Sequence, residues 1–592
     1  MADSRSTITP NDLPHPFNLY KVLLNSDMLH FGYWEAGKDG VTLEEAQQAA
    51  TALLLSQLPA APARVLDIGC GLGATSSLLQ NKGYEVIAIS PDKSAIDYAE
   101  AVHPGPQYFS IGFLDDHPIL RGDHTYDVVL MQESLQYFPE LQPVFTKIKK
   151  LIKDGTSRII ICDEVSYDKG TNQFSVVKNV REIERTFHEL GFFVEYHKII
   201  GDEVAPTCTE TLHRFEEKQQ VLMDTIDDAP KYLEHYINGW RHQEKAYRNG
   251  TMGYEIWSLR YSDISTRNYR TGDESIILEA FNKTFNVNRS IEHWVWKFKE
   301  NPDGGPYTSL SWDGDKIAAQ ITGYPLTLDL GSNQEVVAFH NGDTMVVPEY
   351  RGVGIGRNNL LSRTFRFFEK NVLPVNVFLI YGFNTGKIRR LCQLFLGVTV
   401  DLKVYEWNYA MTKSTRSGYW SRLQHRIYGF SIAREETVGD WANEVYKAAR
   451  KNYPWLIKRD KTYLHWRYDQ QPDFSYSFYV VKRWGKPLGW FVVRKEGEKI
   501  YLVDALLNRQ KADTILKMAI LRLHTDYPEA KALNSWFSEV PEWWNKLLAD
   551  AGFEKHRQFQ ELYLACKSYD KRVTTQMLAD NFYFTMGDGD LY

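Results

Sequence analysis

The sequence predicts a multidomain protein of the α/β class: an open, mainly parallel sheet with helices on both faces, followed by two copies of a smaller α/β unit. Three observations support this. Short β-branched runs alternate with amphipathic stretches over about the first 265 residues, the order that produces a parallel sheet. A tryptophan-to-proline motif occurs twice in the second half. The chain has 592 residues, more than one hydrophobic core organises.

The first unit is predicted over residues 1–265. Its strands are expected in four β-branched segments, at residues 63–70, 84–90, 126–132 and 157–164. Amphipathic stretches between them predict helices. The polar stretch Thr209–Asn249 is interpreted as an inserted helical segment, and Gly253–Tyr261 as a closing strand.

The second half predicts two further units, at residues 266–415 and 425–592. The motif from Trp296 to Asp303 has the same Trp-to-Pro spacing as the one from Trp466 to Asp473. In each copy a helical stretch precedes the motif, strand pairs follow it, and a helix ending in glycine comes later. Because several features recur in one order, we expect two copies of one fold.

Composition limits the partners. Apolar residues make up 43% and charged residues 24% of the chain, as in ordinary globular proteins. A formal net charge of −6 argues against nucleic acid as the main partner. The five cysteines form no C-x-x-C pair, so no thiolate zinc site is expected. With no apolar run of about 18 residues and no apolar leader, we expect a cytoplasmic protein that binds a small molecule and neither membrane nor nucleic acid.

A glycine-rich loop follows the first strand, in the run Val65-Leu-Asp67-Ile-Gly-Cys-Gly-Leu-Gly73. Glycines let the backbone approach a ligand closely and adopt positive φ. Asp67 stands at the strand end, where it can meet an amino group. Ser76 occupies the place of the third glycine of the dinucleotide fingerprint, which argues against a dinucleotide.

These residues resemble the class I methyltransferases that use S-adenosylmethionine (SAM), so a Rossmann-like domain is expected here. In that family the loop wraps the methionine part of SAM. The resemblance therefore implies cofactor contacts from the loop residues Asp67, Gly69, Cys70, Gly71 and Gly73.

Further cofactor contacts follow from the same resemblance. Ser90 replaces the usual ribose-binding acid at the end of the second strand, as in a variant found in tocopherol and cyclopropane-forming methyltransferases. Tyr33 belongs to a segment that caps the SAM site in similar enzymes. Gln132 ends the fourth strand, and Leu114 and Asp115 stand where adenine is normally met.

Candidate catalytic residues follow the fourth strand in Glu133-Ser-Leu-Gln-Tyr137. Relatives that methylate amines or activated carbons often carry Glu-Ser-x-x-His, and Tyr137 takes the His place. The pair can bind a cationic amine by charge and π-face, or Glu133 can remove a proton. Alternatively, Glu133 only caps the following helix. No metal is expected, because SAM supplies the reactivity.

A second glycine turn lies between a predicted strand and helix, in Val346-Val-Pro-Glu-Tyr-Arg-Gly-Val-Gly-Ile-Gly356. Backbone N–H groups at such a helix start form an anion site suited to a pyrophosphate. The candidate contacts are Val347, Arg351, Gly352, Val353, Gly354, Ile355 and Gly356.

This turn resembles motif A of the GNAT acyltransferases, which implies acetyl-CoA or another acyl-CoA as a second cofactor. Asn384 would lie near the pantetheine arm, and Gln393 occupies the place of the tyrosine that often protonates the leaving thiolate. Asp343 is favoured as the base over Glu335 and His340.

The third unit lacks a glycine turn at residues 506–520, which predicts a degenerate GNAT-like domain that does not bind CoA. The sequence therefore favours a bifunctional biosynthetic transferase that methylates and acylates a small, amine-bearing metabolite or sugar. Two alternatives remain for the GNAT half: it acts on carrier-bound acyl groups, or it only binds substrate. The oligomeric state stays unassigned.

Overall fold

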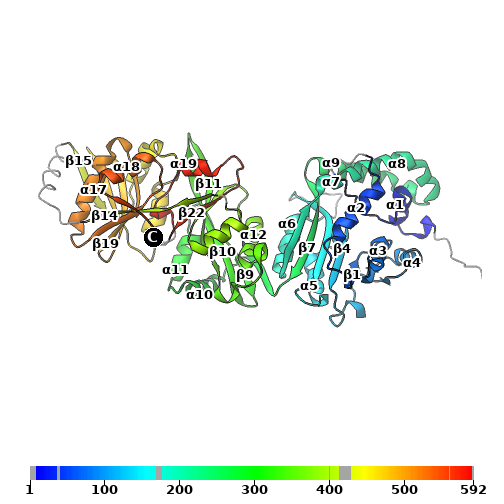
Figure 1. Ribbon diagram of the computed structural model, residues 1–592. Helices are drawn as coiled ribbons and strands as arrows, with labels where there is room; N and C mark the ends of the chain where they lie inside the picture. The colour runs from blue at the N-terminus through cyan, green and yellow to red at the C-terminus, as the bar shows by residue number, and fades with distance from the viewer. Residues whose placement is uncertain are drawn as a thin grey trace, which may run out of the picture. The chain divides into compact units, whose positions relative to one another are not determined.

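The computed structural model describes residues 9–35, 40–168, 177–398, 400–411, 428–558 and 561–589. The chain divides into two compact units between Arg267 and Asn268, which are coloured blue to cyan-green and green to red in Figure 1. Each unit is described by itself.

The first unit is built on a seven-stranded sheet with the order β3-β2-β1-β4-β5-β7-β6. Of these strands, β7 runs antiparallel to both of its neighbours. The order reverses direction between β1 and β4, and such a switch point creates a crevice at the carboxyl ends of the strands. The bounds are β1 (Arg64–Ile68), β2 (Glu85–Ser90), β3 (Gln107–Ser110), β4 (Val128–Gln132), β5 (Arg158–Ser166), β6 (Phe192–Ile199) and β7 (Met252–Tyr261).

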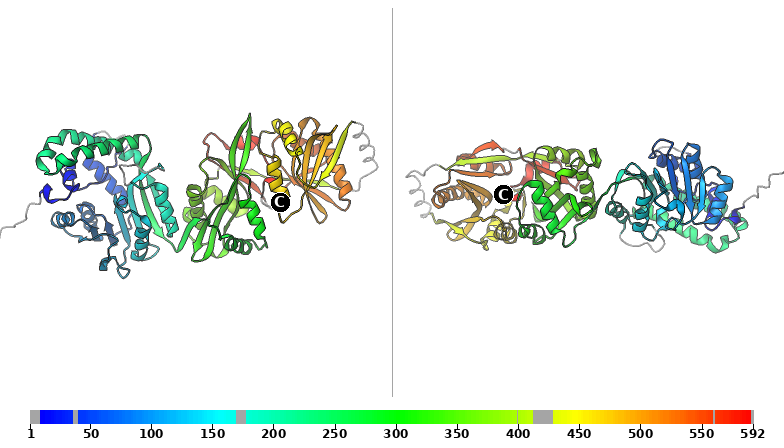
Figure 2. Two further views of the ribbon diagram at one scale, coloured as in Figure 1. Left: turned by 180° about the vertical axis from the view of Figure 1, so that it is seen from behind. Right: turned by 90° about the horizontal axis from the view of Figure 1, so that it is seen from below.

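Helices cover both faces of this sheet, and an apolar cluster lies on each face. The prediction of a Rossmann-like α/β fold for this part is confirmed. The expected helical insertion is an antiparallel pair, α8 and α9, and α8 packs on α1, as Figures 1 and 2 show. The helices are α1 (Phe17–Leu24), α2 (Leu43–Leu55), α3 (Ala74–Asn81), α4 (Lys93–Val102), α5 (Leu141–Leu151), α6 (Val180–Glu189), α7 (Gly201–Val204), α8 (Pro206–Thr225) and α9 (Ala229–Arg248).

The second unit contains two sheets. The first has the order β13-β22-β12-β11-β10-β16-β23, with β9 also paired to β10 and β8 to β9. Its strands are β8 (Ile264–Asn268), β9 (Tyr307–Asp313), β10 (Lys316–Gly331), β11 (Gln334–Val346), β12 (Val377–Asn384), β13 (Val400–Lys403), β16 (Trp455–Ile457), β22 (Tyr563–Ser568) and β23 (Phe582–Tyr583). Helices α10 (Glu274–Phe285), α11 (Ile291–Trp294), α12 (Leu360–Asn371) and α13 (Gly386–Phe395) belong to this half.

The second sheet of this unit has the order β15-β17-β18-β19-β20-β14-β21. Its strands are β14 (Tyr405–Ala410), β15 (Phe430–Glu435), β17 (Ser477–Arg483), β18 (Lys486–Glu496), β19 (Lys499–Leu507), β20 (Ala532–Trp536) and β21 (Glu554–Arg557). The helices of this half are α15 (Trp441–Ala449), α16 (Lys461–Leu464), α17 (Ala512–Asp526), α18 (Glu542–Asp550) and α19 (Thr575–Asn581).

The two halves of the second unit repeat one arrangement. Each has three antiparallel strands, then a helix, then a strand parallel to the third: β9-β10-β11-α12-β12 and β17-β18-β19-α17-β20. The repeated tryptophans meet between the halves. Trp296 Nε1 donates to the Trp466 carbonyl at 2.6 Å, and Trp466 Nε1 donates to the Trp296 carbonyl at 3.0 Å. Such reciprocal contacts are typical of elements related by two-fold symmetry.

The halves also exchange strands. β14, which precedes the second half in sequence, lies between β20 and β21 in the second sheet. β22, near the end of the chain, lies between β12 and β13 in the first sheet. Each sheet is therefore completed by a strand from the other half, while the boundaries at 266–415 and 425–592 stay predictions.

Candidate active site

A cavity of about 470 Å³ opens at the carboxyl ends of β1, β2 and β4 in the first unit. It lies at the switch point of the sheet, where open α/β folds bind their ligands. Its lining includes Met28, Leu29, His30, Asp67, Gly69, Cys70, Gly71, Ser90, Asp92, Ile111, Gly112, Phe113, Gln132, Glu133, Ser134 and Tyr137.

The glycine loop after β1 forms one wall of this cavity. Gly69, Gly71 and Gly73 all have positive φ, at 80°, 54° and 85°. A Cβ on Gly69 would lie 2.6 Å from the Cβ of Ser134, so a larger residue would force the wall apart. The backbone thus requires glycine here for both conformation and space.

Asp67 stands at the end of β1 and is 2% exposed. Burial raises the pKa of Asp67 to about 6, and the Ser76 hydroxyl donates a hydrogen bond to it. Ser76, which stands in place of a third glycine, therefore fixes the acid. Asp67 is placed where it can accept a hydrogen bond from an amino group in the cavity.

Other predicted cofactor residues also line the cavity. Ser90 is buried at the end of β2, and its hydroxyl accepts a hydrogen bond from the Asp92 amide at 3.3 Å. Asp92 itself caps α4 through the Ala95 amide at 3.0 Å. The Gln132 side chain accepts a hydrogen bond from the Thr75 hydroxyl at 2.9 Å.

Four of the residues predicted to bind SAM are not among those that line the cavity. Tyr33 turns to Lys198, whose Nζ donates to the phenol oxygen at 3.1 Å, and residues 28–30 of the same segment face the cavity instead. Leu114 is 48% exposed. The carboxylate of Asp115 folds back to the Gly112 amide at 2.7 Å. Gly73 packs against α4, since a Cβ there would meet Ala99 at 2.7 Å.

Glu133 follows β4 with a φ of 52°, which is uncommon outside glycine. Its Oε1 accepts hydrogen bonds from the Phe31 amide at 2.7 Å and from the Tyr254 hydroxyl at 2.8 Å. Removal from bulk solvent raises the pKa of Glu133 to about 8. The side chain thus contacts two distant segments, and Ser134 is the residue that stands at the cap position of the short helix Leu135–Tyr137. Tyr137, at the end of that helix, is 72% exposed.

Two further carboxylates at the end of β5 belong to this region and were not singled out from the sequence. Asp163 accepts a hydrogen bond from the Leu135 amide at 2.8 Å, and burial raises its pKa to about 8. Glu164 accepts hydrogen bonds from Gln243 at 2.6 Å and from the Tyr247 hydroxyl at 2.9 Å, and burial raises its pKa to about 7. In the sequence, two adjacent acids near the carboxyl end of a predicted strand could have indicated these residues.

The second glycine turn lies in the other unit. Gly354 has a φ of 74°, and a Cβ there would lie 2.1 Å from the Asn358 carbonyl oxygen, so only glycine fits. Helix α12 begins at Leu360, and the Asn359 side chain caps it through the Ser362 amide at 2.9 Å. The helix therefore begins four residues after Gly356, where the sequence predicted that the turn would open it directly.

The other predicted residues of this turn form few side-chain contacts. Ile355 is 91% exposed. Arg351 Nε donates to the Val346 carbonyl at 3.3 Å. Val347 is buried, and Gly352 has open space around its Cα. Val353 closes the turn because its carbonyl accepts a hydrogen bond from the Leu360 amide at 3.0 Å.

Asp343, the favoured base, forms ion pairs with Arg289 and with Lys297, the latter at 2.9 Å. A carboxylate held by two cations is a weak base, because both cations stabilise its ionised form. Asn384 ends β12 and donates to Cys392 Sγ at 3.5 Å. Glu335 pairs with Lys458 at 2.9 Å. His340 is buried between the rings of Tyr324 and Tyr381.

No helix in the described part of the chain combines the length and hydropathy needed to cross a bilayer.

Comparison with known proteins finds relatives for part of the first unit. Residues 43–200 match the family model described as a methyltransferase domain. An O-methyltransferase of Penicillium expansum is 28% identical over 222 residues, which are 34% of this chain and 79% of that protein. Magnesium-protoporphyrin O-methyltransferase of Rhodobacter capsulatus is 32% identical over 117 residues. The matched residues are 18% of this chain and half of that protein.

Among solved structures, a cyclopropane synthase of Mycobacterium tuberculosis is 15% identical over 42% of this chain and 98% of its own, with a TM-score of 0.37. The family match, and the sheet and glycine loop already described, lead to one conclusion: the N-terminal part of this chain contains a class I SAM-dependent methyltransferase domain.

Proposed function

We propose that the first unit transfers a methyl group from SAM to a small acceptor that carries an amine. The observation that supports this most is the charge around the cavity. Glu133 lines the cavity, and the charges of Asp163 and Glu164 act on it. All three are hydrogen-bonded to neutral donors, and within the residues described no lysine or arginine is paired with any of them. Such a site favours positively charged ligands.

The cavity fits SAM on two structural grounds. The glycine loop leaves a cradle that a Cβ on Gly69 would fill. Ser134 lines the cavity and is 5% exposed. Its hydroxyl has no hydrogen-bond partner among the described residues. Asp67 and the loop would hold the amino-acid part, and Ser90 the ribose. SAM supplies an activated methyl group on a sulfonium centre.

Glu133 would act on the acceptor. A protonated amine binds next to its carboxylate, and Glu133 Oε2 takes the ammonium proton so that the nitrogen lone pair becomes available. The freed lone pair could then accept the methyl group that bound SAM would supply, with S-adenosylhomocysteine as the other product. Tyr137 lines the cavity and is 72% exposed, and its ring would contact the cation.

Calorimetry with SAM tests the cofactor half of this proposal. Asp67→Asn removes a buried charged acceptor, and we expect SAM affinity to fall about 30-fold or more, as for loss of a charged hydrogen bond. Asp97→Asn, an exposed α4 aspartate paired with Lys93, is the matched control and should bind normally. Equal affinity in Asp67→Asn and wild type would contradict the assignment.

Labelled methyl transfer tests the acceptor half. We expect label to enter primary and secondary amines and amino sugars, and not the same compounds with hydroxyl in place of amine. Transfer to the hydroxyl compounds at equal rates would show that the acidic residues do not select a cation.

We also infer a second activity, acyl transfer from acyl-CoA by the second unit. The supporting observation is that β11 and β12 pair only as far as His340 and Tyr381, although β11 continues to Val346. Parallel strands that stop pairing beside a glycine turn leave backbone groups free to bind a long, thin ligand whose pyrophosphate would rest on the turn. The acceptor would be the same amine-bearing metabolite.

Gly354→Trp tests CoA binding, because the side chain would enter the turn. The matched control is Gly314→Trp, which also has positive φ but open space around it. We expect CoA binding to be lost in the first variant and kept in the second. Absence of CoA binding in the wild-type protein would leave the second unit as a substrate-binding module.

A further inference from the structure

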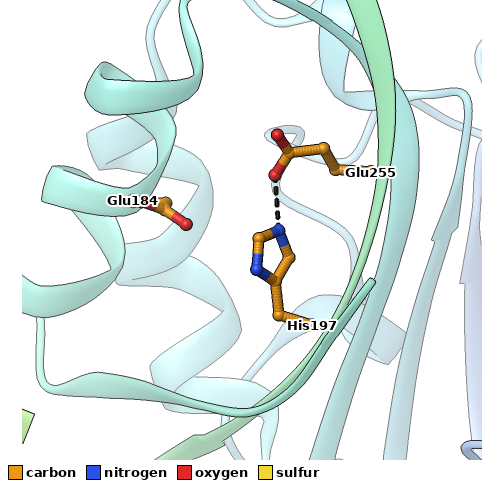
Figure 3. A group of neighbouring side chains, drawn as sticks. All are labelled: Glu184, His197 and Glu255. Carbon is orange, nitrogen blue, oxygen red and sulfur yellow. Dashed lines mark hydrogen bonds and ion pairs between the residues drawn. The ribbon is translucent and has the colours of Figure 1, made fainter. Parts of the chain in front are cut away.

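A second cluster of ionisable side chains lies in the first unit, outside the lining of the cavity. It comprises Glu184 on α6, His197 on β6 and Glu255 on β7. One ligand-type atom from each residue lies within 4.8 Å of the other two. Figure 3 shows Glu184 directed from its helix toward His197 and Glu255, which come from the neighbouring strands.

Two of the three side chains in this cluster are buried carboxylates. Glu184 and Glu255 are 3% and 2% exposed, and burying a carboxylate is unfavourable unless a partner compensates for lost hydration. His197 Nε2 lies 2.6 Å from Glu255 Oε2. A cation bound among the three side chains would interact favourably with both carboxylates.

A neighbouring phenol also holds one of the carboxylates in place. The Tyr167 hydroxyl donates to Glu255 Oε1 at 3.0 Å, and Glu255 Oε2 faces His197 Nε2. The carboxylate is therefore oriented toward the histidine before any ion binds.

The strands fix the ligand side chains in advance. β6 and β7 pair so that His197 is opposite Trp257, and Ile199 is opposite Glu255. The His197 ring stacks on Trp257 with an interplanar angle of 7° and a centroid distance of 5.8 Å. Preset orientation of this kind lowers the cost of ordering ligands around an ion.

We propose that Glu184, His197 and Glu255 bind a divalent first-row transition metal ion, with Zn²⁺ as the preferred ion, that fastens α6 to the β6–β7 edge of the sheet. One imidazole and two carboxylates form a ligand set for Zn²⁺, and three protein ligands leave a position for water. Mg²⁺ prefers an all-oxygen set. On binding, the hydrogen bond between His197 and Glu255 is replaced by bonds to the ion.

This site is independent of the proposed methyl transfer, and it differs from the expectation of no metal drawn from the sequence. That expectation concerned the reaction, which needs none. The three ligands are 13 and 58 residues apart in the chain, so no spacing motif announces them.

The test measures zinc in the full-length, untagged protein after chelation, reloading with Zn²⁺ and gel filtration. We expect about one zinc ion more per wild-type chain than in Glu184→Gln or His197→Asn. Loss of either ligand should weaken zinc binding about tenfold or more. The matched controls are Glu217→Gln and His213→Asn on α8, whose side chains are about 60% exposed.

Thermal melting gives a second readout. With Zn²⁺ at 100 times its Kd, the wild-type transition should rise by about 5–10 °C, and the two ligand variants should not respond. Near-ultraviolet circular dichroism checks that the variants are folded. If His197→Asn does not fold, the comparison of wild type with Glu184→Gln decides the test. Equal zinc content in wild type and Glu184→Gln, or no zinc in wild type, would overturn the proposal.

Discussion

The two units of this protein bury charge in opposite ways. In the second unit, Arg459 is fully buried and binds Asp504 through Nε at 3.0 and 3.1 Å. Its Nη2 atom donates to the carboxylate of Asp588, which is also buried. In the first unit, Asp163 and Glu164 are just as buried, but neutral groups solvate them.

This difference distinguishes two uses of buried polar groups. An arginine with two carboxylate partners holds the turn Met586–Asp588 against β19, which is a structural use of buried charge. The carboxylates of the first unit keep a raised pKa beside a cavity. Perturbed pKa values of this kind are common at functional sites, and under the proposed function these carboxylates would favour a cationic ligand.

The largest effect on stability is expected from removal of the buried arginine that pairs with two aspartates. Arg459→Met leaves Asp504 and Asp588 buried without a cation, and we expect the second unit to lose about 3–5 kcal/mol of unfolding free energy. Arg572→Met removes an 85% exposed partner of Asp570 and should change stability by less than about 0.5 kcal/mol. Chemical denaturation measures both. A change below about 1 kcal/mol for Arg459→Met would remove the structural half of the comparison.

In the first unit, loss of a carboxylate should affect rate more than stability. Glu133→Gln keeps the hydrogen bonds to Phe31 and Tyr254 but cannot take a proton, so kcat should fall about 100-fold. SAM affinity should stay within about threefold of wild type. Glu140→Gln, an exposed residue before α5, is the control. A kcat unchanged by Glu133→Gln would exclude proton removal by this residue.

The pH dependence of stability should separate the two units. Burial raises the folded-state pKa values of Asp163 and Glu164 to about 8 and 7, from 3.8 and 4.5 for the solvated side chains. The folded state therefore holds protons that the unfolded state releases. Stability is highest below pH 4 to 5 for these groups and falls as pH rises toward 8, by up to about 1.4 kcal/mol per pH unit for each group.

Urea titrations of the wild-type protein from pH 5 to 8 measure this slope, and Asp163→Asn should flatten it. Addition of SAM should also reduce the slope, because its cation compensates the ionised carboxylates. Stability of the first unit that increases over this interval would contradict the assignment.

The smallest effect is expected from one neutral donor. Tyr247→Phe removes the hydroxyl that donates to Glu164 at 2.9 Å, which should cost about 1 kcal/mol. The acceptor KM should rise about fivefold without a comparable fall in kcat. Tyr428→Phe, whose ring is 62% exposed in the second unit, serves as the control. Identical behaviour of the two variants would assign Glu164 no part in acceptor binding.

Local patterns were sufficient to predict the first unit and much of its cavity. Strand, glycine loop and helix follow one another in sequence, so Asp67, Gly69 and Gly71 could be placed by inspection. The same reasoning was not sufficient for Tyr33, Leu114 and Asp115, which do not line the cavity. The direction of Tyr33 depends on Lys198, 165 residues away, and that of Asp115 on a backbone amide three residues before it. Spacing in the sequence carries neither piece of information.

The second unit was less predictable because its pairings are remote. The repeat of Trp296 and Trp466 is visible in the sequence, whereas their hydrogen bonds to each other are not. Asp343 illustrates the consequence for sites. Its position on a strand suggested a base, but Arg289 comes from a loop 54 residues earlier and pairs with it. The GNAT-like character of this unit stays a prediction, which rests on its turn and strand order.

The exchanged strands β14 and β22 have a consequence for how this half of the protein is made and dissected. When the ribosome has synthesised residue 415, it has not yet made β22 (Tyr563–Ser568), so the first sheet cannot be completed until that strand has been synthesised. Cutting the chain in the intervening segment would leave two fragments, each carrying a strand of the other's sheet. The two halves are thus one folding unit, and expression of either alone would expose an unpaired sheet edge, a recognised cause of aggregation.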